Sequence, residues 1–264
     1  MNAAIIIPAR FASKRYPGKP LIPLRGVTGI AKPLIQRSWE AAMAVRWISR
    51  VVVATDDERI AKTARSFGAD VVMTPESCAN GTERCAAALG ALGPDIDVIV
   101  NLQGDAPLTP PFCVESILTA MVNEDVVVAT PALRTLPETR RRLLADQAAG
   151  RVGGTTVAVD RRGDALYFSK SVIPHVPARA LDDPDLPVFL HIGVYAYRRD
   201  ALLRYAATSS CPLEELEGLE QLRFLDMREP VRVVSVTSAH DIWELNNPED
   251  LPVIEAGLAS RSVA

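Results

Sequence analysis

Short apolar segments alternate with amphipathic helical segments through the first half of the chain, and this order limits the folds that the chain can adopt. The apolar segments are rich in Val and Ile and lie at residues 3–7, 50–55, 71–73, 97–102 and 126–130. The segments between them carry apolar residues at helical spacing and lie at residues 33–45, 58–67, 81–92 and about 114–121. Strands that are apolar throughout are buried on both faces, which is typical of parallel sheets covered by helices. We therefore predict an α/β fold with a doubly wound, mostly parallel sheet.

The middle of the chain is rich in predicted strands. Segments 155–159 and 165–168 flank a polar turn and predict a hairpin, and segment 188–197 predicts one long strand. Together they predict a smaller β-rich lobe at about 154–197, within a single domain that spans residues 1–264. This lobe is a candidate dimer surface.

Helical patterns flank this lobe on both sides. Residues 131–153 are polar and predict a helical segment in which Arg140–Arg142 face solvent. Leucines recur at every third position from 213 to 225 and predict one helix with acidic side chains on its other faces. A strand at 231–236 and a helix after Pro248 are predicted at the end of the chain.

The composition excludes several classes of protein. Of the 264 residues, 48% are hydrophobic and 23% are charged, which is ordinary for a soluble globular protein. The formal net charge of −3 gives no bulk attraction to nucleic acid or membranes, so we expect neither as a partner. The four cysteines and three histidines lack the spacing of a zinc site or a disulfide framework. No charged leader precedes a long apolar run, which predicts a cytoplasmic protein without membrane insertion.

Positive charge is concentrated at the start of the chain. Residues 1–55 contain nine Lys or Arg and one acidic residue, Glu40. Four of these basic residues lie among prolines and a glycine directly after the first strand: Arg10, Lys14, Arg15 and Lys19. Guanidinium groups, ammonium groups and free backbone amides are the donors that polyphosphate oxygens require. The segment predicts a triphosphate site, and a solvated basic loop is the alternative.

A second polar turn follows the fourth strand, with the sequence Q-G-D-A-P at residues 103–107. Ligands of parallel sheets bind at the carboxyl ends of the strands, so this turn and the basic segment are expected at the same edge. The carboxylate of Asp105 can hold Mg²⁺ while the ion keeps waters and phosphate oxygens as its other ligands. The alternative is a turn aspartate that bonds its own backbone.

Eight short motifs occur in a fixed order along the chain: P-A-R-F-A-S-K-R-Y-P-G-K-P, A-T-D-D, N-G-T-E-R, N-L-Q-G-D-A-P, A-L-Y-F-S-K, H-I-G-V-Y-A-Y, L-E-Q-L-R and N-P-E-D-L. In this order they resemble the 3-deoxy-manno-octulosonate cytidylyltransferase (CMP-Kdo synthetase) family, to about residue 255. The first motif and Q-G-D-A-P are specific in combination. The resemblance implies a Rossmann-like nucleotidyltransferase fold with a β-rich dimerisation insert, a homodimer, and a role in lipopolysaccharide or capsule synthesis.

The resemblance also implies a role for individual residues. Arg10, Ser13, Arg15 and Lys19 would line the CTP site, with Arg15 and Lys19 on the phosphates, and Asp105 would ligate Mg²⁺. The residues implied around the acid sugar are Arg84, Gln103, Lys170, His191, Tyr195, Glu220 and Gln221. A carboxylate and several hydroxyls on a sugar require a cation together with hydrogen-bond donors and acceptors, which this set supplies. Without the family, a hydrogen-bonded core histidine and a solvated glutamate would be the expected interpretations of His191 and Glu220.

The implied reaction is the transfer of CMP from CTP to the anomeric hydroxyl of the sugar, with release of pyrophosphate. Positioning and charge neutralisation would supply most of the catalysis. Two alternatives remain: a nucleotidyltransferase for a different acid sugar, such as an amino-Kdo, and a CTP-binding pseudoenzyme.

The chain departs from the family pattern at three places. Asn246 stands where the family has an aspartate metal ligand, and Glu244 is a candidate substitute for the lost carboxylate. The stretch also has the features of an ordinary helix start at Asn247. The segment 25–37 is about five residues longer than is usual in the family, and Lys170 replaces the usual arginine, which removes a bidentate fork.

Overall fold

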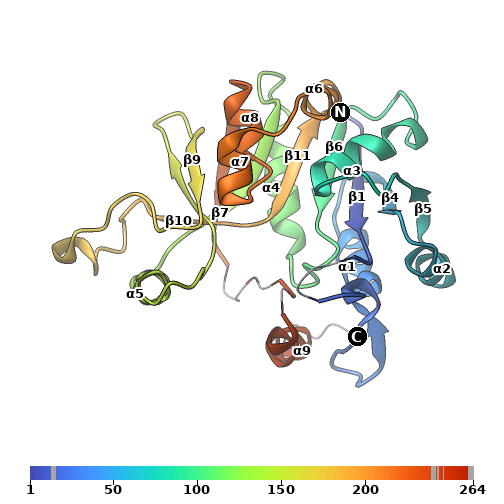
Figure 1. Ribbon diagram of the computed structural model, residues 1–264, viewed down its shortest axis with the longest axis horizontal. Helices are drawn as coiled ribbons and strands as arrows, with labels where there is room; N and C mark the ends of the chain where they lie inside the picture. Colours follow the sequence, from blue (N-terminus) through green and yellow to red (C-terminus); the bar gives the residue numbers. More distant parts are fainter. Residues whose placement is uncertain (13–15, 239–241, 243, 246, 261–264) are drawn as a thin grey trace.

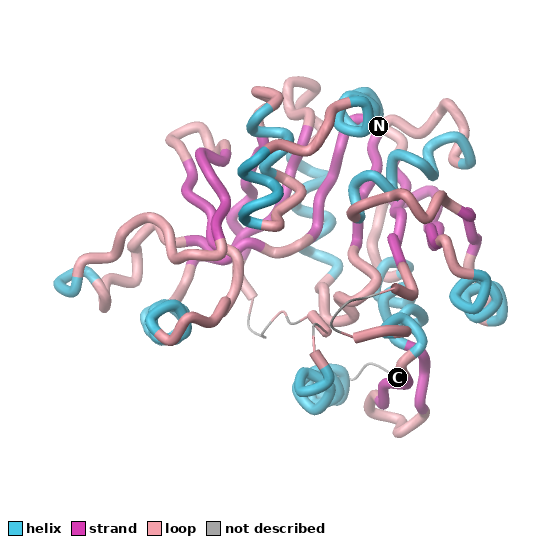
Figure 2. The backbone as a smooth tube through the Cα atoms, viewed as in Figure 1, coloured by secondary structure: helices cyan, strands magenta, loops and turns pink. Residues whose placement is uncertain are grey.

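One ten-stranded sheet with helices on both faces forms the body of the molecule (Figures 1 and 2). The computed structural model describes residues 1–12, 16–238, 242, 244–245 and 247–260. In spatial order the strands are β5 (Asp70–Met73), β4 (Ile48–Thr55), β1 (Ala3–Ala9), β6 (Val98–Leu102), β11 (Val194–Arg198), β7 (Val128–Arg134), β10 (Phe189–His191), β8 (Thr156–Val159) and β9 (Ala165–Ser169), with β12 (Val231–Val236) beside β7. The helices are α1 (Leu34–Met43), α2 (Glu58–Ser66), α3 (Gly81–Ala88), α4 (Pro111–Ala120), α5 (Pro137–Ala148), α6 (Arg199–Ala207), α7 (Pro212–Glu217), α8 (Leu222–Asp226) and α9 (Leu251–Ser260).

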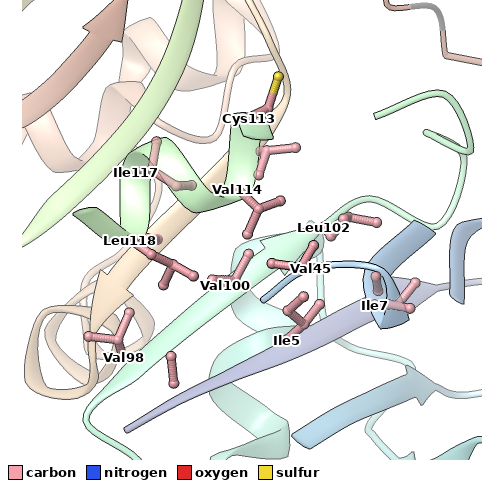
Figure 3. Packing of buried hydrophobic residues seen from close by; sticks show 14 of the residues in the cluster. Ile5, Ile7, Val45, Val98, Val100, Leu102, Cys113, Val114, Ile117 and Leu118 are labelled. Atoms are coloured by element: carbon pink, nitrogen blue, oxygen red, sulfur yellow. The ribbon is translucent and has the colours of Figure 1, made fainter. Parts of the chain in front are cut away.

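The first four strands in this order are parallel, as the sequence pattern predicts. β1 is buried along its whole length, and successive side chains point to opposite faces. Ile5 and Ile7 pack with residues of α1, α2 and α4, whereas Ala4 and Ile6 pack with residues of α3 and α6. Figure 3 shows the first of these two layers, in which Val114 and Ile117 of α4 lie over Val98 and Val100 of β6. The predicted α/β fold is therefore confirmed.

The second half of the sheet is largely antiparallel and divides at β7. One edge of β7 pairs in parallel with β12. The other edge pairs with β11 at Ala129 and with β10 at Ala132. The long strand predicted at 188–197 is therefore wrong in one respect, since Ile192 and Gly193 interrupt it. Figure 1 shows β9, β10 and α5 at one end of the molecule and β4, β5 and α2 at the other.

Two helical predictions are also corrected. Residues 131–134 belong to β7, and α5 begins only at Pro137. Arg140 does not face solvent: it is fully buried, and its guanidinium donates to the carbonyl oxygens of Leu181 (2.7 Å) and Asp183 (3.0 Å). This arginine therefore satisfies backbone acceptors of a neighbouring loop, a role that has no periodic signal in sequence.

The helix predicted at 213–225 is two helices. α7 ends at Gly218, which has a left-handed backbone (φ 61°), and α8 begins at Leu222. Leu213 and Leu216 are exposed, whereas Leu219 and Leu222 are buried. The leucines thus do not share one helical face, and the break turns the segment that follows it towards the interior.

The end of the chain packs beside the beginning. α9 contacts the short strand β2 (Pro23–Arg25), which pairs with β3 (Ala31–Pro33) in a small hairpin. Leu24, Leu34, Leu245, Ile254 and Leu258 form a small separate core there. The longer segment 25–37 forms this hairpin and the start of α1, and its residues lie outside the cavity described below. Across the described ranges, no helix is long and apolar enough to cross a membrane.

Candidate active site

A large open cavity of about 1910 Å³ lies between the parallel half of the sheet and the β-rich half. The loop after β1 and the turn after β6 both reach it, as predicted from the carboxyl ends of parallel strands. Ten of the predicted site residues line it: Arg10, Lys19, Arg84, Gln103, Asp105, Lys170, His191, Tyr195, Glu220 and Gln221. Ser13, Arg15 and Asn246 lie outside the described residues. The ligand contacts of all these residues stay predictions.

An ion pair joins Lys19, a predicted phosphate contact, to Asp105, the predicted metal ligand. The Lys19 ammonium donates to Asp105 Oδ2 and also to the carbonyl oxygen of Leu245 (2.8 Å). The backbone N–H of Leu245 in turn donates to the carbonyl oxygen of Asp105 (2.9 Å). Leu245, in the C-terminal segment, is thereby held beside Asp105.

Gly104 allows the turn after β6 to approach the end of β1 closely. A Cβ at this position would lie 2.8 Å from the carbonyl oxygen of Pro8, a distance that real side chains do not adopt. The hydroxyl of Ser38 on α1 donates to the carbonyl oxygen of Gly104 (2.9 Å) and fixes the turn from the other side. Any side chain at 104 would therefore move Asp105 away from the basic loop.

The side chains at this place fit a Mg²⁺ ion that takes most of its ligands from water and phosphate rather than from the protein. No group of three or more His, Cys, Asp or Glu side chains within the described ranges could hold a metal by itself. Mg²⁺ commonly uses one or two protein carboxylates and takes its other ligands from water and phosphate. Asp105 supplies one carboxylate at the cavity wall, and Glu244 lines the same cavity. The Glu244 carboxylate lies against Gly193, where an added Cβ would be 2.7 Å from its Oε1.

Glu220 forms the centre of a polar cluster at the start of α3. Its Oε2 accepts the backbone N–H of Thr82 (2.9 Å), and its Oε1 accepts the side-chain amide of Gln103 (3.3 Å). Burial raises the pKa of Glu220, and the backbone hydrogen bonds only partly offset this effect. Gln221 is 2% exposed, and its Nε2 has no hydrogen-bond partner among the residues that the structure describes. A buried donor without a partner is costly, which is consistent with a ligand acceptor at this position.

Arg223 holds this cluster in place, and the sequence prediction did not include it. It is 3% exposed and donates through Nε and Nη2 to the two carboxylate oxygens of Glu214, each at 2.7 Å. Its Nη2 also contacts Glu83 of α3 at 3.0 Å. α7, α8 and α3 are thus joined around the segment that carries Glu220 and Gln221. The only sequence signal for this role is the arginine that ends the L-E-Q-L-R motif.

His191 and Tyr195 also line the cavity. Burial lowers the pKa of His191 to about 3, so its ring is neutral at physiological pH. The His191 ring centre lies 5.1 Å from that of Phe168 and 5.4 Å from that of Tyr195. Burial also raises the pKa of Tyr195, which keeps its hydroxyl protonated. His191 is thus hydrogen-bonded, as a core histidine would be, and also lines the cavity.

The two predicted sugar-binding cations differ in their surroundings. Arg84 is 2% exposed and donates to Asp56 (2.7 Å) and to the hydroxyl of Thr74 (2.6 Å). Its charge is therefore balanced within the protein. Lys170 is exposed, and its ammonium lies beside Gly218, 3.0 Å from where a Cβ would stand.

Comparison with known proteins gives a consistent assignment of the family. A family model described as "Cytidylyltransferase" matches residues 4–231. A 3-deoxy-manno-octulosonate cytidylyltransferase from Maricaulis maris is 42% identical over 98% of this chain and 98% of its own length. An 8-amino-3,8-dideoxy-manno-octulosonate cytidylyltransferase from Shewanella woodyi is 38% identical over 98% of this chain and 99% of its own length.

The fold has a similar relative among solved structures. A CMP:2-keto-3-deoxy-manno-octonic acid synthetase, solved in complex with CTP, superposes with a TM-score of 0.83. The two chains are 32% identical, and the alignment covers 99% of this chain and 100% of the other. The resemblance seen in the eight motifs therefore extends to the whole fold.

Proposed function

Because the chain belongs to the cytidylyltransferase family and, within it, to the 3-deoxy-manno-octulosonate cytidylyltransferases, we propose that it transfers CMP from CTP to the anomeric hydroxyl of Kdo or a closely related acid sugar. Pyrophosphate is the second product. The observation that carries this proposal is the meeting of two polar groups at one cavity: the pair Lys19–Asp105, and the cluster of Gln103, Glu220 and Gln221.

The first group suits a triphosphate. Arg10 is exposed at the cavity, Lys19 reaches it from the basic segment, and Ser13 and Arg15 belong to the same segment. Asp105, with Glu244 or Asn246, would hold Mg²⁺. When bound, the ion would neutralise phosphate charge and lower the pKa of the attacking hydroxyl.

The second group suits a sugar that carries one carboxylate and several hydroxyls. The Gln221 amide is a buried donor, Glu220 is an acceptor for hydroxyl protons, and Tyr195 carries a protonated phenol. Lys170 supplies an accessible positive charge, whereas the charge of Arg84 is balanced by Asp56 and leaves this arginine a role as a hydrogen-bond donor. The neutral ring of His191 adds a polar group without a charge.

In the proposed reaction the anomeric oxygen of the sugar forms a bond to the α-phosphorus of CTP. The bond from that phosphorus to the bridging α–β oxygen breaks, pyrophosphate leaves, and the hydroxyl proton is released. The residues of the chain contribute orientation and charge rather than a covalent intermediate. Once Lys19 is released from Asp105, its ammonium group would stabilise the negative charge of the departing pyrophosphate.

A pyrophosphate-release assay with CTP, Mg²⁺ and a panel of 3-deoxy sugars tests the assignment. We expect turnover with Kdo, and a loss of several powers of ten in Asp105→Asn, which removes the charge that the metal needs. Asp125→Asn changes an exposed carboxylate outside the cavity and is the matched control. Near-normal CTP consumption in Asp105→Asn would exclude the assignment, and CTP binding without release with any sugar would identify a pseudoenzyme.

An amino-Kdo is the second candidate substrate. The Shewanella woodyi relative named for the 8-amino sugar covers nearly all of this chain. Inclusion of 8-amino-3,8-dideoxy-manno-octulosonate in the panel decides between the two sugars by their kcat/KM values.

We also propose that the enzyme acts in the cytoplasm as a homodimer, in the synthesis of a surface polysaccharide. Exposed apolar side chains in and beside the β-rich lobe support the dimer, among them Leu136 and Leu166. Sedimentation should give twice the mass of one chain, and Leu166→Lys should shift the protein towards the monomer. A monomer at micromolar wild-type concentration would contradict the dimer.

A further inference from the structure

Thr130 lies in β7, and its side chain contacts the ring of His191. Its side chain is fully buried, so its hydroxyl depends on protein partners. Its Oγ1 is 2.9 Å from His191 Nε2, 2.7 Å from the carbonyl oxygen of Val194 and 3.3 Å from the carbonyl oxygen of Ile192.

The position of these contacts follows from the break between β10 and β11. β7 pairs with β10 at Ala132 and with β11 at Ala129, and Thr130 lies between the two ladders. The carbonyl oxygens of Ile192 and Val194 turn inward at the break, and the Thr130 hydroxyl reaches both. The threonine thus gives the Val194 carbonyl oxygen a donor at the break, whereas the Ile192 carbonyl oxygen also accepts the backbone N–H of Val194 (2.7 Å).

The proton of Thr130 determines which nitrogen of His191 carries a hydrogen. A hydroxyl has one proton to donate, and both carbonyl oxygens can only accept. The shortest contact, to Val194, uses that proton. The Nε2 atom of His191 must then donate to Thr130 Oγ1, because two acceptors cannot form a hydrogen bond with each other.

In a neutral imidazole only one nitrogen carries a hydrogen. The low pKa that burial gives His191 keeps the ring in this neutral form. With the hydrogen on Nε2, the Nδ1 atom keeps a free lone pair, and no described residue forms a hydrogen bond with it. The ring lines the cavity beside Tyr195.

We propose that Thr130 is a positioning residue that holds His191 as the Nε2-protonated tautomer, so that Nδ1 accepts a hydrogen bond from a hydroxyl group of the acid sugar. This rests on the proposed function. An Nδ1 lone pair repels carboxylate oxygens, so His191 selects a hydroxyl group of the sugar over its carboxylate, and the sugar carboxylate binds elsewhere in the cavity. Thr130 itself touches no substrate.

The tautomer can be measured in the free protein, without turnover. The chain has three histidines, so the ring ¹⁵N signals of His191 can be assigned by their loss in His191→Gln. We expect the wild type and Thr130→Ser to show a protonated Nε2 and an unprotonated Nδ1. Thr130→Val removes the acceptor and should shift the ring to the other tautomer or to a mixture. A wild type protonated on Nδ1, or an unchanged tautomer in Thr130→Val, would overturn the proposal.

Kinetics then test the consequence for substrate. Thr130→Val should raise the KM for the sugar by about tenfold, the effect of one lost hydrogen bond, with the KM for CTP changed less than about twofold. Thr130→Ser, which keeps the hydroxyl, should have a sugar KM close to that of the wild type. Thr156→Val is the control, because it removes another fully buried strand hydroxyl, which bonds backbone groups of Ser171 (2.7 Å) and Ile173 (3.0 Å).

Equal rises in the two KM values in Thr130→Val, or the same rise in Thr156→Val, would show a general loss of structure and contradict a positioning role. If the protein released no pyrophosphate with any sugar, the proposed function would fail. The ¹⁵N measurement would still decide whether Thr130 sets the tautomer.

Discussion

Glu220 places a carboxylate in the cavity wall, where it accepts the backbone N–H of Thr82 and the side-chain amide of Gln103. Burial raises its pKa above 4.5, its ordinary value. The folded protein therefore binds this proton more tightly than the unfolded chain does. As the pH rises through the interval between the two pKa values, the free energy of unfolding falls, and at neutral pH the charged carboxylate destabilises the fold.

Glu220→Gln should therefore keep or raise the melting temperature at pH 7.5, and its advantage over the wild type should shrink as the pH is lowered towards 4.5. The KM for the sugar should rise, because a charged acceptor is lost. Thermal unfolding at pH 7.5 and pH 5 checks the first expectation, with Glu76→Gln as an exposed control. A lower melting temperature for Glu220→Gln at pH 7.5 would contradict the destabilising role of this charge.

The sequence predicted which residues approach the site but not what they contact. Lys19 and Asp105 were assigned to two different elements, and their ion pair across 86 positions has no local signal. Arg84 was predicted as a sugar contact, yet its guanidinium pairs with Asp56. Such partners depend on how loops from separate strands approach each other, and a motif records only the residue types.

Gly218 is the element-scale feature that places Glu220 and Gln221. Its backbone is left-handed (φ 61°), which lets α7 end and the chain turn inward before α8. Gly218→Ala should lower the free energy of unfolding by about 1 kcal/mol, because an L side chain is strained in this conformation. Chemical denaturation measures the loss, and Gly90→Ala, which has open space and an ordinary backbone, is the control. Equal stability of the two variants would contradict the strain.

Arg223 fixes the same elements through buried charge. Arg223→Met should lower the free energy of unfolding by about 3–5 kcal/mol, because it leaves the carboxylate of Glu214 buried and unpaired. Arg46→Met breaks a more exposed pair with Glu115 and should cost much less stability. Urea denaturation of both variants checks the difference. Similar losses of unfolding free energy in the two variants would show that burial does not increase the contribution of the Arg223 ion pair to stability.

Helices and strands with one uninterrupted residue pattern were predicted well, whereas segments in which the helix or strand is interrupted were not. β1 and β4 read as continuous apolar runs and were found within two residues of the expected bounds. The leucine repeat at 213–225 suggested one helix, because spacing alone does not show that its first leucines are exposed. The break between β10 and β11 was missed for a similar reason. A residue pattern indicates where a strand forms, but the strand that it pairs with, here β7, lies elsewhere in the chain and decides where the hydrogen-bond ladder is interrupted.

At the scale of the whole molecule, the cavity joins the parallel half of the sheet to the β-rich half, so a ligand that fills it should stabilise both. CTP with Mg²⁺ at about a hundred times its Kd should add about 2.7 kcal/mol to the free energy of unfolding. Chelation of the metal, or the variant Asp105→Asn, should remove most of this gain. Thermal shift measurements with and without the metal decide the point. A gain from CTP that does not depend on Mg²⁺ would contradict a metal site at Asp105.

The ion pair of Lys19 with Asp105 also determines how charge moves when the site fills. In the resting protein the ammonium is the counter-ion of the carboxylate, so neither charge is left unbalanced while the site waits. If Asp105 holds Mg²⁺ as proposed, Lys19 would lose this carboxylate as its counter-ion, and a phosphate of the bound nucleotide would be available to replace it. Filling the site would then be an ion exchange, in which the metal replaces Lys19 as the partner of Asp105 and the nucleotide replaces Asp105 as the partner of Lys19.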